Sequence, residues 1–118
     1  MKTHKQLDVW QQAMVLVKMV YDITASFPRE EMFGLTSQMR RAAVSIPSNI
    51  AEGCARSSTK EYLHFVAISR GSLSELDTQV DIAIMLGYCD PGSSILMQLQ
   101  RVGALVGGLH KSLRELIK

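Results

Sequence analysis

The feature that most constrains this chain is the apolar spacing between Gly34 and Gly53. In this stretch apolar side chains recur every three or four residues, as they do in a helix that buries one face. They are Met39, Ala42, Ala43, Ile46 and Ile50. A polar line at the same spacing contains Arg41, Ser45, Asn49 and Glu52. The spacing predicts an amphipathic helix whose apolar face must be covered by other helices.

Three further segments have the same period, and local signals suggest where each helix begins and ends. Phe27-Pro28 ends the first, because the residue before a proline is pushed out of the α region. Ser58 with Glu61 forms a capping-box pattern, and Asp90-Pro91 is an N-cap followed by proline at the first helical position. The four predicted helices span about residues 6–26, 35–52, 58–86 and 91–117.

Proline and glycine mark special positions within these helices. Pro47 removes one backbone donor and clashes with the carbonyl of Ala43, so we expect the second helix to be kinked there. We expect Gly53 to occupy the left-handed position that ends this helix. Gly71 lies inside the third helix, where glycine costs about 1 kcal/mol relative to alanine. Close approach of another helix is the plainest explanation for it.

Together these signals predict an all-α fold. Short connections between four helices indicate antiparallel neighbours, so we expect an up-down-up-down four-helix bundle. A chain of 118 residues is long enough for one core, and no internal repeat or linker divides it. We therefore expect residues 1–118 to form a single domain.

The first helix has a predicted core-facing seam, and further apolar side chains lie away from the seams of the first and third helices. The seam contains Trp10, Met14, Val17, Tyr21 and Thr24. The further apolar side chains are Leu16, Ile23, Ile68, Ile82, Met85 and Leu86. Exposed apolar surface marks association sites, so this surplus predicts a homo-oligomer, either a dimer or a closed ring. The alternative is a wide core stripe that buries these side chains within one protomer.

The net charge of +2 is too small to indicate a nucleic-acid partner by itself. Its distribution is uneven, because residues 35–60 carry four basic residues against one acidic residue. Residues 61–87 carry one basic residue against four acidic ones. One interpretation is that the two segments lie together and neutralise each other; the other is that the basic segment binds phosphate.

No pattern typical of an enzyme or a metal site is found. Cys54 and Cys89 lack metal-binding spacing, and His4, His64 and His110 are scattered with no Glu-x-x-His partner. No glycine-rich phosphate loop is present. No apolar run approaches the ~20 residues that a membrane helix needs. We expect a non-enzymatic cytoplasmic protein with no cofactor, catalytic residue, metal or membrane segment.

The segment FPREEMFGLTSQMRRAAVSIPSNIAEGCAR begins at Phe27, and GSLSEL and LGY follow at Gly71 and Leu86. These residues resemble the 23S rRNA intervening-sequence proteins of bacteria, a family of four-helix bundles. The resemblance implies a homopentameric barrel. Some relatives are encoded within ribosomal RNA insertions. Others are accessory subunits of diversity-generating retroelement reverse transcriptases and bind nucleic acid.

The family motif covers Arg40, Arg41, Pro47, Asn49, Glu52 and Gly53, and it implies no catalytic role. Our leading hypothesis is an oligomeric bundle, pentameric by resemblance, that binds RNA or DNA through a basic surface, beside a protein partner or as an accessory subunit. The candidate binding residues are Arg29, Arg40, Arg41, Arg56 and Lys60. Pro47, Asn49, Glu52 and Gly53 are expected to be structural or interface residues. The alternative is a protein-interaction scaffold that binds no nucleic acid, with structural arginines paired to Asp77, Asp81 or Glu52.

Overall fold

The computed structural model describes residues 3–117, which contain four α-helices, two short 3₁₀ helices and no strand. The expected all-α class with four helices is confirmed for this part of the chain. The α-helices are α1 (Asp8–Thr24), α2 (Leu35–Cys54), α3 (Thr59–Met85) and α4 (Ile95–Leu116). The 3₁₀ helices are η1 (His4–Gln6) and η2 (Arg29–Glu31).

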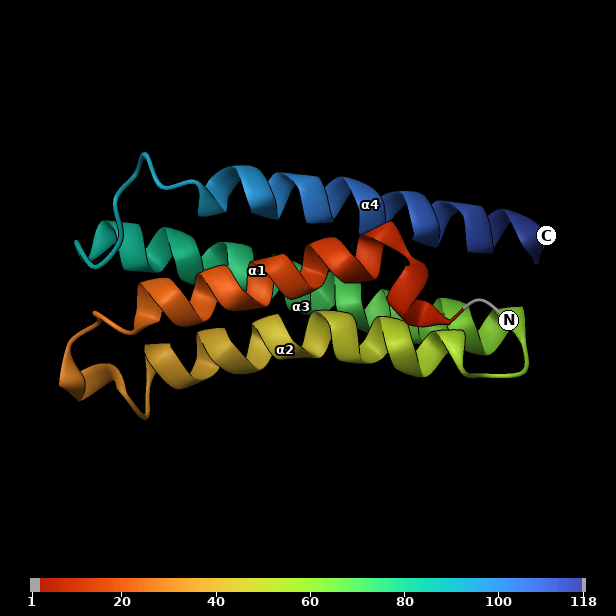
Figure 1. Cartoon of the computed structure of the whole chain (residues 1–118), viewed down its shortest axis with the longest axis horizontal. Helices are drawn as coiled ribbons and strands as arrows, with labels where there is room; N and C mark the ends of the chain where they lie inside the picture. The colour runs from red at the N-terminus through yellow and green to blue at the C-terminus, as the bar shows by residue number, and fades with distance from the viewer. Residues whose placement is uncertain (1–2, 118) are drawn as a thin grey trace.

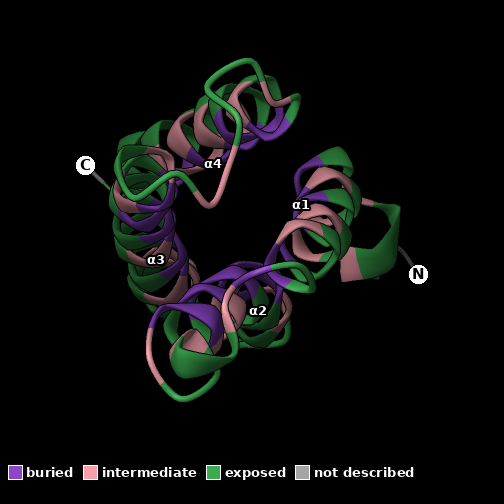
Figure 2. Ribbon diagram, turned by 90° about the vertical axis from the view of Figure 1, so that its left-hand side faces the viewer, coloured by how far each residue is buried: buried purple, intermediate pink, exposed green. Residues whose placement is uncertain are grey.

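The four helices lie alongside one another in a rod 45 Å long and 23 Å by 22 Å across. The connections α1–α2 and α3–α4 lie at one end of this rod, and the α2–α3 connection lies at the other (Figure 1). Viewed along the rod, α1, α2, α3 and α4 follow one another around its circumference with their buried residues turned inward (Figure 2). Each helix therefore contributes one face to a shared core.

The predicted apolar line of α2 is confirmed, because all five of its side chains are buried. The same helical period places a buried line on α3, from Val66 to Ala83, and another on α4, from Ile95 through Val106. The largest fully buried side chains include Leu16, Met39, Ile46, Ile50, Leu76 and Ile95. Removing large apolar side chains of this kind from water is the main stabilising contribution to such a fold.

The predicted seam of α1 is wrong by one residue, or about 100° around the helix, from Trp10 to Tyr21, and only its last member, Thr24, is buried as predicted. The side chains that α1 buries are Val9, Ala13, Leu16, Val20 and Thr24. Tyr21 and Met14 are exposed, while Trp10 and Val17 are half-buried at the flank. Apolar residues cover more than one side of α1, so two lines both fit the helical period. The smaller side chains occupy the interior, while the larger rings of Trp10 and Tyr21 lie at the flank and at the surface.

The two ends of α3 are stabilised by short-range hydrogen bonds. At its start the Ser58 hydroxyl accepts a hydrogen bond of 3.1 Å from the Glu61 amide, which confirms the predicted cap. At its end Gly87 has a φ of +80°, and its amide donates to the carbonyl of Ile84. The Tyr88 amide donates to Ala83. This is a Schellman motif, in which glycine takes the left-handed position without strain.

The predicted start of α4 at Pro91 is wrong, since the helix begins at Ile95. Asp90 to Ser93 instead form a turn, in which the Ser93 amide donates to the Asp90 carbonyl over 3.0 Å. The Asp90 carboxylate accepts a 2.7 Å hydrogen bond from the Gly92 amide. Aspartate, proline and glycine in this order suit a tight turn as well as a helix start, and glycine after the proline disfavours helix.

Gly53 and Gly71 both differ from expectation. Gly53 lies inside α2, and the one positive φ among residues 3–117 belongs to Gly87. A Cβ on Gly53 would lie 2.9 Å from Tyr62 Cδ1 and 3.0 Å from the Cβ of Phe65, so Gly53 lets α3 approach α2 closely. A Cβ on Gly71 would meet nothing within 4 Å. The predicted close approach therefore occurs at Gly53 rather than at Gly71.

α2 continues through the buried Pro47, and the bend at that residue stays a prediction. The carbonyl groups beside it are bound by polar side chains. Ser69 of α3 donates to the carbonyl of Ile46 over 2.8 Å, and the amide of Asn49 donates to the carbonyl of Ser45 over 2.8 Å. Both bonds lie in the turn that contains Pro47, whereas the carbonyl that loses its amide donor to the proline is that of Ala43.

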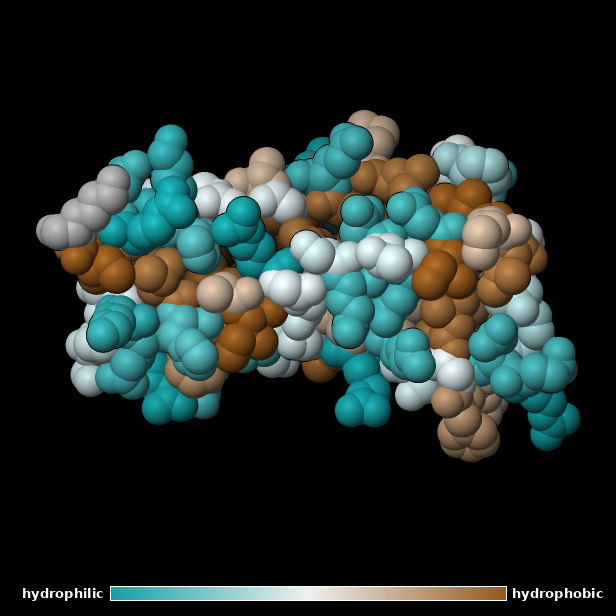
Figure 3. All heavy atoms as spheres, turned by 180° about the vertical axis from the view of Figure 1, so that it is seen from behind, coloured by the Kyte–Doolittle hydropathy of each residue, from teal (hydrophilic) through white to brown (hydrophobic). Residues whose placement is uncertain are grey.

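The predicted apolar surplus is present only in part. Leu16 is fully buried in the core, which contradicts its assignment to the outer surface. Ile23 and Ile82 are half-buried against the core. Ile68, Leu86 and especially Met85, at 75% exposure, remain accessible. Apolar residues are visible at the surface of the molecule seen from behind (Figure 3).

Candidate functional site

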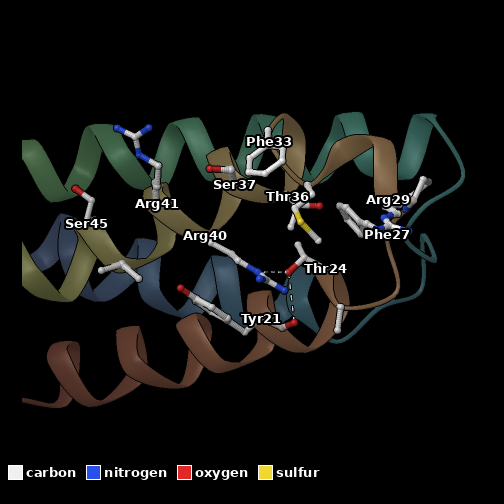
Figure 4. Close-up of a pocket in the computed structure, with 14 residues that line it drawn as sticks. Tyr21, Thr24, Phe27, Arg29, Phe33, Thr36, Ser37, Arg40, Arg41 and Ser45 are labelled. Carbon is white, nitrogen blue, oxygen red and sulfur yellow. Dashed lines mark hydrogen bonds between the residues drawn. The ribbon is translucent and has the colours of Figure 1, made fainter.

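A groove of about 680 Å³ opens where the end of α1, the α1–α2 connection and the first half of α2 meet. Figure 4 shows the side chains that line it. Three of them are basic, namely Arg29, Arg40 and Arg41. Among the described residues, no acidic side chain lines the groove. The lining therefore has positive charge that no carboxylate within the groove neutralises.

Arg40 is held by two neighbours on α1. Its Nε donates a hydrogen bond of 2.9 Å to the Thr24 hydroxyl, and its Cζ lies 4.6 Å from the centre of the Tyr21 ring. The Thr24 hydroxyl in turn donates to the carbonyl of Val20 over 2.7 Å, so its oxygen is set to accept from Arg40. The cation–π contact and the hydrogen bond orient the guanidinium group. In the described part of the chain, the two terminal nitrogens of Arg40 make no hydrogen bond.

Arg29 and Arg41 are exposed at either side of this arginine. Within residues 3–117 neither makes an ion pair. Figure 4 shows the Arg41 side chain directed away from Arg40. Arg41 also lines a second, polar hollow of about 330 Å³ between α2 and α3, together with Glu75 and Gln79. The side-chain oxygen of Gln79 is buried there without a hydrogen-bond partner among the described residues.

The carboxylate of Glu31 lies beside the groove and is already bound. One oxygen accepts from the Leu35 amide over 3.2 Å, and the other accepts from the Tyr88 hydroxyl over 3.1 Å. The hydrogen bond to Glu31 raises the pKa of Tyr88. Glu31 therefore joins the α1–α2 connection to the α3–α4 connection at the same end of the bundle, and it does not pair with the arginines.

Large apolar side chains are exposed around the arginines. Phe33 is 95% exposed, and Met32, Val44 and Tyr21 are exposed to a smaller degree. Sequence analysis did not identify Phe33, Tyr21 or Thr24 as parts of a site. Phe33 had one usable signal, since it is an aromatic residue in a charged connector directly before a glycine. Tyr21 and Thr24 were assigned to the core seam, so their role beside Arg40 had no separate signal.

The remaining two predicted binding residues lie at the other end of the molecule. Arg56 follows α2, and Lys60 lies in the first turn of α3. Fifteen residues of mostly helical chain put Arg56 roughly 22 Å along the axis from Arg41. Arg56 pairs with Glu52 over 2.9 Å and approaches Glu61 at 3.9 Å. The structure thus divides the five candidates into three unpaired arginines at the groove and a distal group that includes a paired arginine.

The four other motif residues make structural contacts or local pairs. Pro47 and Gly53 are buried in α2, and Asn49 binds the Ser45 carbonyl and hydroxyl. The Ser45 hydroxyl is hydrogen-bonded to that of Ser72 on α3 over 2.8 Å. Glu52 pairs with Arg56. The motif therefore contains Gly53, where α3 approaches α2 closely, as well as two groove arginines.

Residues 3–117 contain no group of three or more histidine, cysteine or acidic side chains arranged to hold a metal ion. His4 packs against Trp10, and His64 packs against Phe65. Burial, followed by the charges of Arg70 and Arg114, lowers the pKa of His110. No helix in the described range is long and apolar enough to cross a membrane.

Comparison with known protein families gives a match over most of the chain. The family model described as 23S rRNA-intervening sequence protein matches residues 5–108, a range that includes α1, α2, α3 and more than half of α4. It also includes all three groove arginines. No curated protein matches the chain.

Proposed function

Because this chain belongs to the family of 23S rRNA-intervening sequence proteins, we propose that it is a non-enzymatic bundle that binds RNA or DNA through the groove arginines. The observation that carries the proposal is the groove lining, which holds Arg29, Arg40 and Arg41 and, among the described residues, no carboxylate. Unpaired arginines in a hollow attract phosphate groups, and phosphate contacts dominate the affinity of proteins for nucleic acids.

Arg40 gives this site a defined geometry. Thr24 and Tyr21 hold the guanidinium group so that its terminal N–H donors remain available. A planar guanidinium group with two free terminal NH₂ groups matches the oxygens of a phosphate, and little side-chain freedom remains to be lost on binding. Arg29 and Arg41 add charge on either side. This combination supports binding that depends on charge and does not depend on base sequence.

Assembly is a second part of the proposal. We propose a homo-oligomer, with a ring of five as the favoured form, in which copies cover exposed apolar residues such as Ile68, Met85 and Leu86. Each protomer in this proposal follows an up-down-up-down antiparallel course with α2 bent at Pro47. A ring repeats the groove arginines around one axis, and simultaneous contacts raise the apparent affinity. A role as accessory subunit beside a protein partner is consistent with such a ring.

The alternative is a scaffold with structural arginines, and one observation favours it. Arg56 pairs with Glu52, one of the three carboxylates that this alternative names, and its Cζ lies 4.7 Å from the Phe65 ring centre. In residues 3–117, Asp77 and Asp81 form no ion pair with any arginine. The scaffold interpretation thus accounts for the distal arginine and leaves the three groove arginines without a role.

Filter binding of an RNA hairpin at several salt concentrations tests the main proposal. Each phosphate contact contributes about −0.7 to −0.9 to the slope of log affinity against log salt. Arg41→Gln should therefore make the slope of log affinity against log salt shallower by roughly the value of one phosphate contact. It should weaken binding to a similar degree for RNAs of different base sequence. Arg101→Gln, on α4 outside the groove, removes the same charge and should leave the slope unchanged.

Two results would count against the proposal. One is the absence of hairpin binding at about 50 mM salt, and the other is a flat response between about 50 and 200 mM. Light scattering of the same samples tests the assembly separately. A monodisperse monomer at every protein concentration would refute the ring and would leave the single-groove contact to be judged by the salt data.

A further inference from the structure

Phe33 is the most exposed large apolar side chain among residues 3–117, although the backbone around it is well anchored. The amide of Gly34 donates to the Glu31 carbonyl over 3.0 Å, and the amide of Met32 donates to the Arg29 carbonyl over 3.1 Å. The side chain of Glu31 binds the Leu35 amide and the Tyr88 hydroxyl. The connector is therefore a compact turn that holds the aromatic ring in solvent.

No packing requirement accounts for this position. At 95% exposure the ring of Phe33 loses almost no contact with water on folding, so it contributes little to stability. Met32 beside it is also exposed. Figure 4 shows the Phe33 ring on the α2 side of the groove, near Ser37 and Thr36. An exposed aromatic ring at the edge of a cationic groove is suited to a partner that has both a flat apolar face and negative charge.

The bases and phosphates of an unpaired nucleic-acid strand provide these two features together. Bases stack on aromatic side chains in proteins that bind single strands, and a basic groove follows the backbone. In a duplex the faces of the bases are already stacked on each other, and side chains cannot enter the narrow major groove of A-form RNA. The ring of Phe33 can therefore be covered by an unpaired base and cannot be covered by the interior of a duplex.

We propose that the groove selects single-stranded nucleic acid, with an unpaired base stacked on Phe33 and a neighbouring phosphate held by Arg40. This inference rests on the proposed function and goes further by naming the form of nucleic acid and the residue that distinguishes it. Arg40 lies seven residues after Phe33 and lines the same groove. Exposed aromatic and arginine side chains also occur at protein interfaces. Three arginines that no groove carboxylate neutralises favour an anionic strand over an uncharged protein surface.

The test compares two probes and three variants of the full chain. The probes are an oligouridylate of about 12 nucleotides, within the usual site size for single strands, and an RNA duplex of the same length. Phe33→Ala should weaken oligouridylate binding by about tenfold or more, because stacking is lost, and should change duplex binding by less than about twofold. Phe33→Tyr should retain binding. Leu116→Ala removes an apolar side chain that is 72% exposed at the opposite end of the bundle and should change neither affinity.

A stacked base can also be observed directly. In Phe33→Trp the added indole should lose fluorescence when oligouridylate binds and keep it when the duplex binds. Equal effects of Phe33→Ala on both probes, or no effect on either, would overturn the stacking inference. If Arg41→Gln still lowers salt-dependent affinity in that case, the proposed function stands. If Phe33→Ala instead dissociates the oligomer in sedimentation, the Phe33 side chain belongs to an interface between protein copies and the inference is wrong.

Discussion

A paired glycine substitution provides a sharp test of the packing between α2 and α3. Gly53 and Gly71 both lie inside helices, so replacing either by alanine gains about 1 kcal/mol of helix propensity. Their surroundings differ. A Cβ at Gly53 would lie 2.9 Å from Tyr62 Cδ1, 3.0 Å from Phe65 Cβ and 3.1 Å from the Tyr62 carbonyl oxygen. A Cβ at Gly71 would meet nothing within 4 Å.

The contacts at Gly53 are shorter than the 3.5–4.0 Å or so at which carbon atoms attract each other, so α3 must move away. One contact is with backbone, which a change of rotamer cannot relieve. Overpacking of this kind costs about 1–3 kcal/mol, and the upper half of that range applies where a whole helix must shift. After the gain in propensity, Gly53→Ala should destabilise by about 1–2 kcal/mol. Gly71→Ala should stabilise by about 0.5–1 kcal/mol.

Urea denaturation followed by circular dichroism measures both variants. A difference of about 2 kcal/mol between them corresponds to a difference of about 1 M urea in midpoint for a domain of this size. The two proteins should be compared at equal and at several concentrations, because assembly also stabilises the folded state. If Gly53→Ala raises the midpoint as much as Gly71→Ala does, the close approach of α3 to Gly53 does not limit the packing and the reasoning is refuted.

Two further substitutions test contacts made by α3. Burial, and secondarily Cys54, raises the pKa of Tyr62 from 10.0 to about 12. The contribution of the protonated Tyr62 side chain to folding stability is therefore complete below pH 10 and is lost as the pH rises through about 12. Tyr62→Phe should flatten this alkaline decline in urea titrations at several pH values; an unchanged decline would contradict the assignment. Ser69→Ala removes the buried donor to the Ile46 carbonyl and should cost about 1–2 kcal/mol, whereas Ser74→Ala, at an exposed position, should be neutral in the same assay.

The spacing of apolar residues along the sequence was enough to predict most of the fold without knowledge of any tertiary contact. α2 and α4 each contain one well-defined apolar stripe, so their buried faces follow from the sequence, whereas α3 also carries apolar residues such as Ile68 and Met85 outside its buried line. The Ser58 cap is equally local, because its donor and acceptor are three residues apart. Arg40 and Arg41 were also identified as candidates, since basic residues outnumber acidic ones in residues 35–60.

What periodicity left open was decided by neighbours distant in sequence. Tyr21 and Leu16 both fit an apolar stripe on α1, and only the positions of α2 and α4 determine that Leu16 enters the core while Tyr21 supports Arg40. The need for glycine at position 53 of α2 likewise arises from Tyr62 and Phe65, which α3 places against it.

The division of the basic residues into two groups has the same origin. Fifteen residues of mostly helical chain separate Arg56 from Arg41, and the fold places Glu61 of α3 beside Arg56, which also pairs with Glu52. Local spacing determines which face of a helix is apolar, because that depends on one chain segment. Which side chains remain free to bind depends on what the other helices place beside them, and this is decided only when the bundle forms.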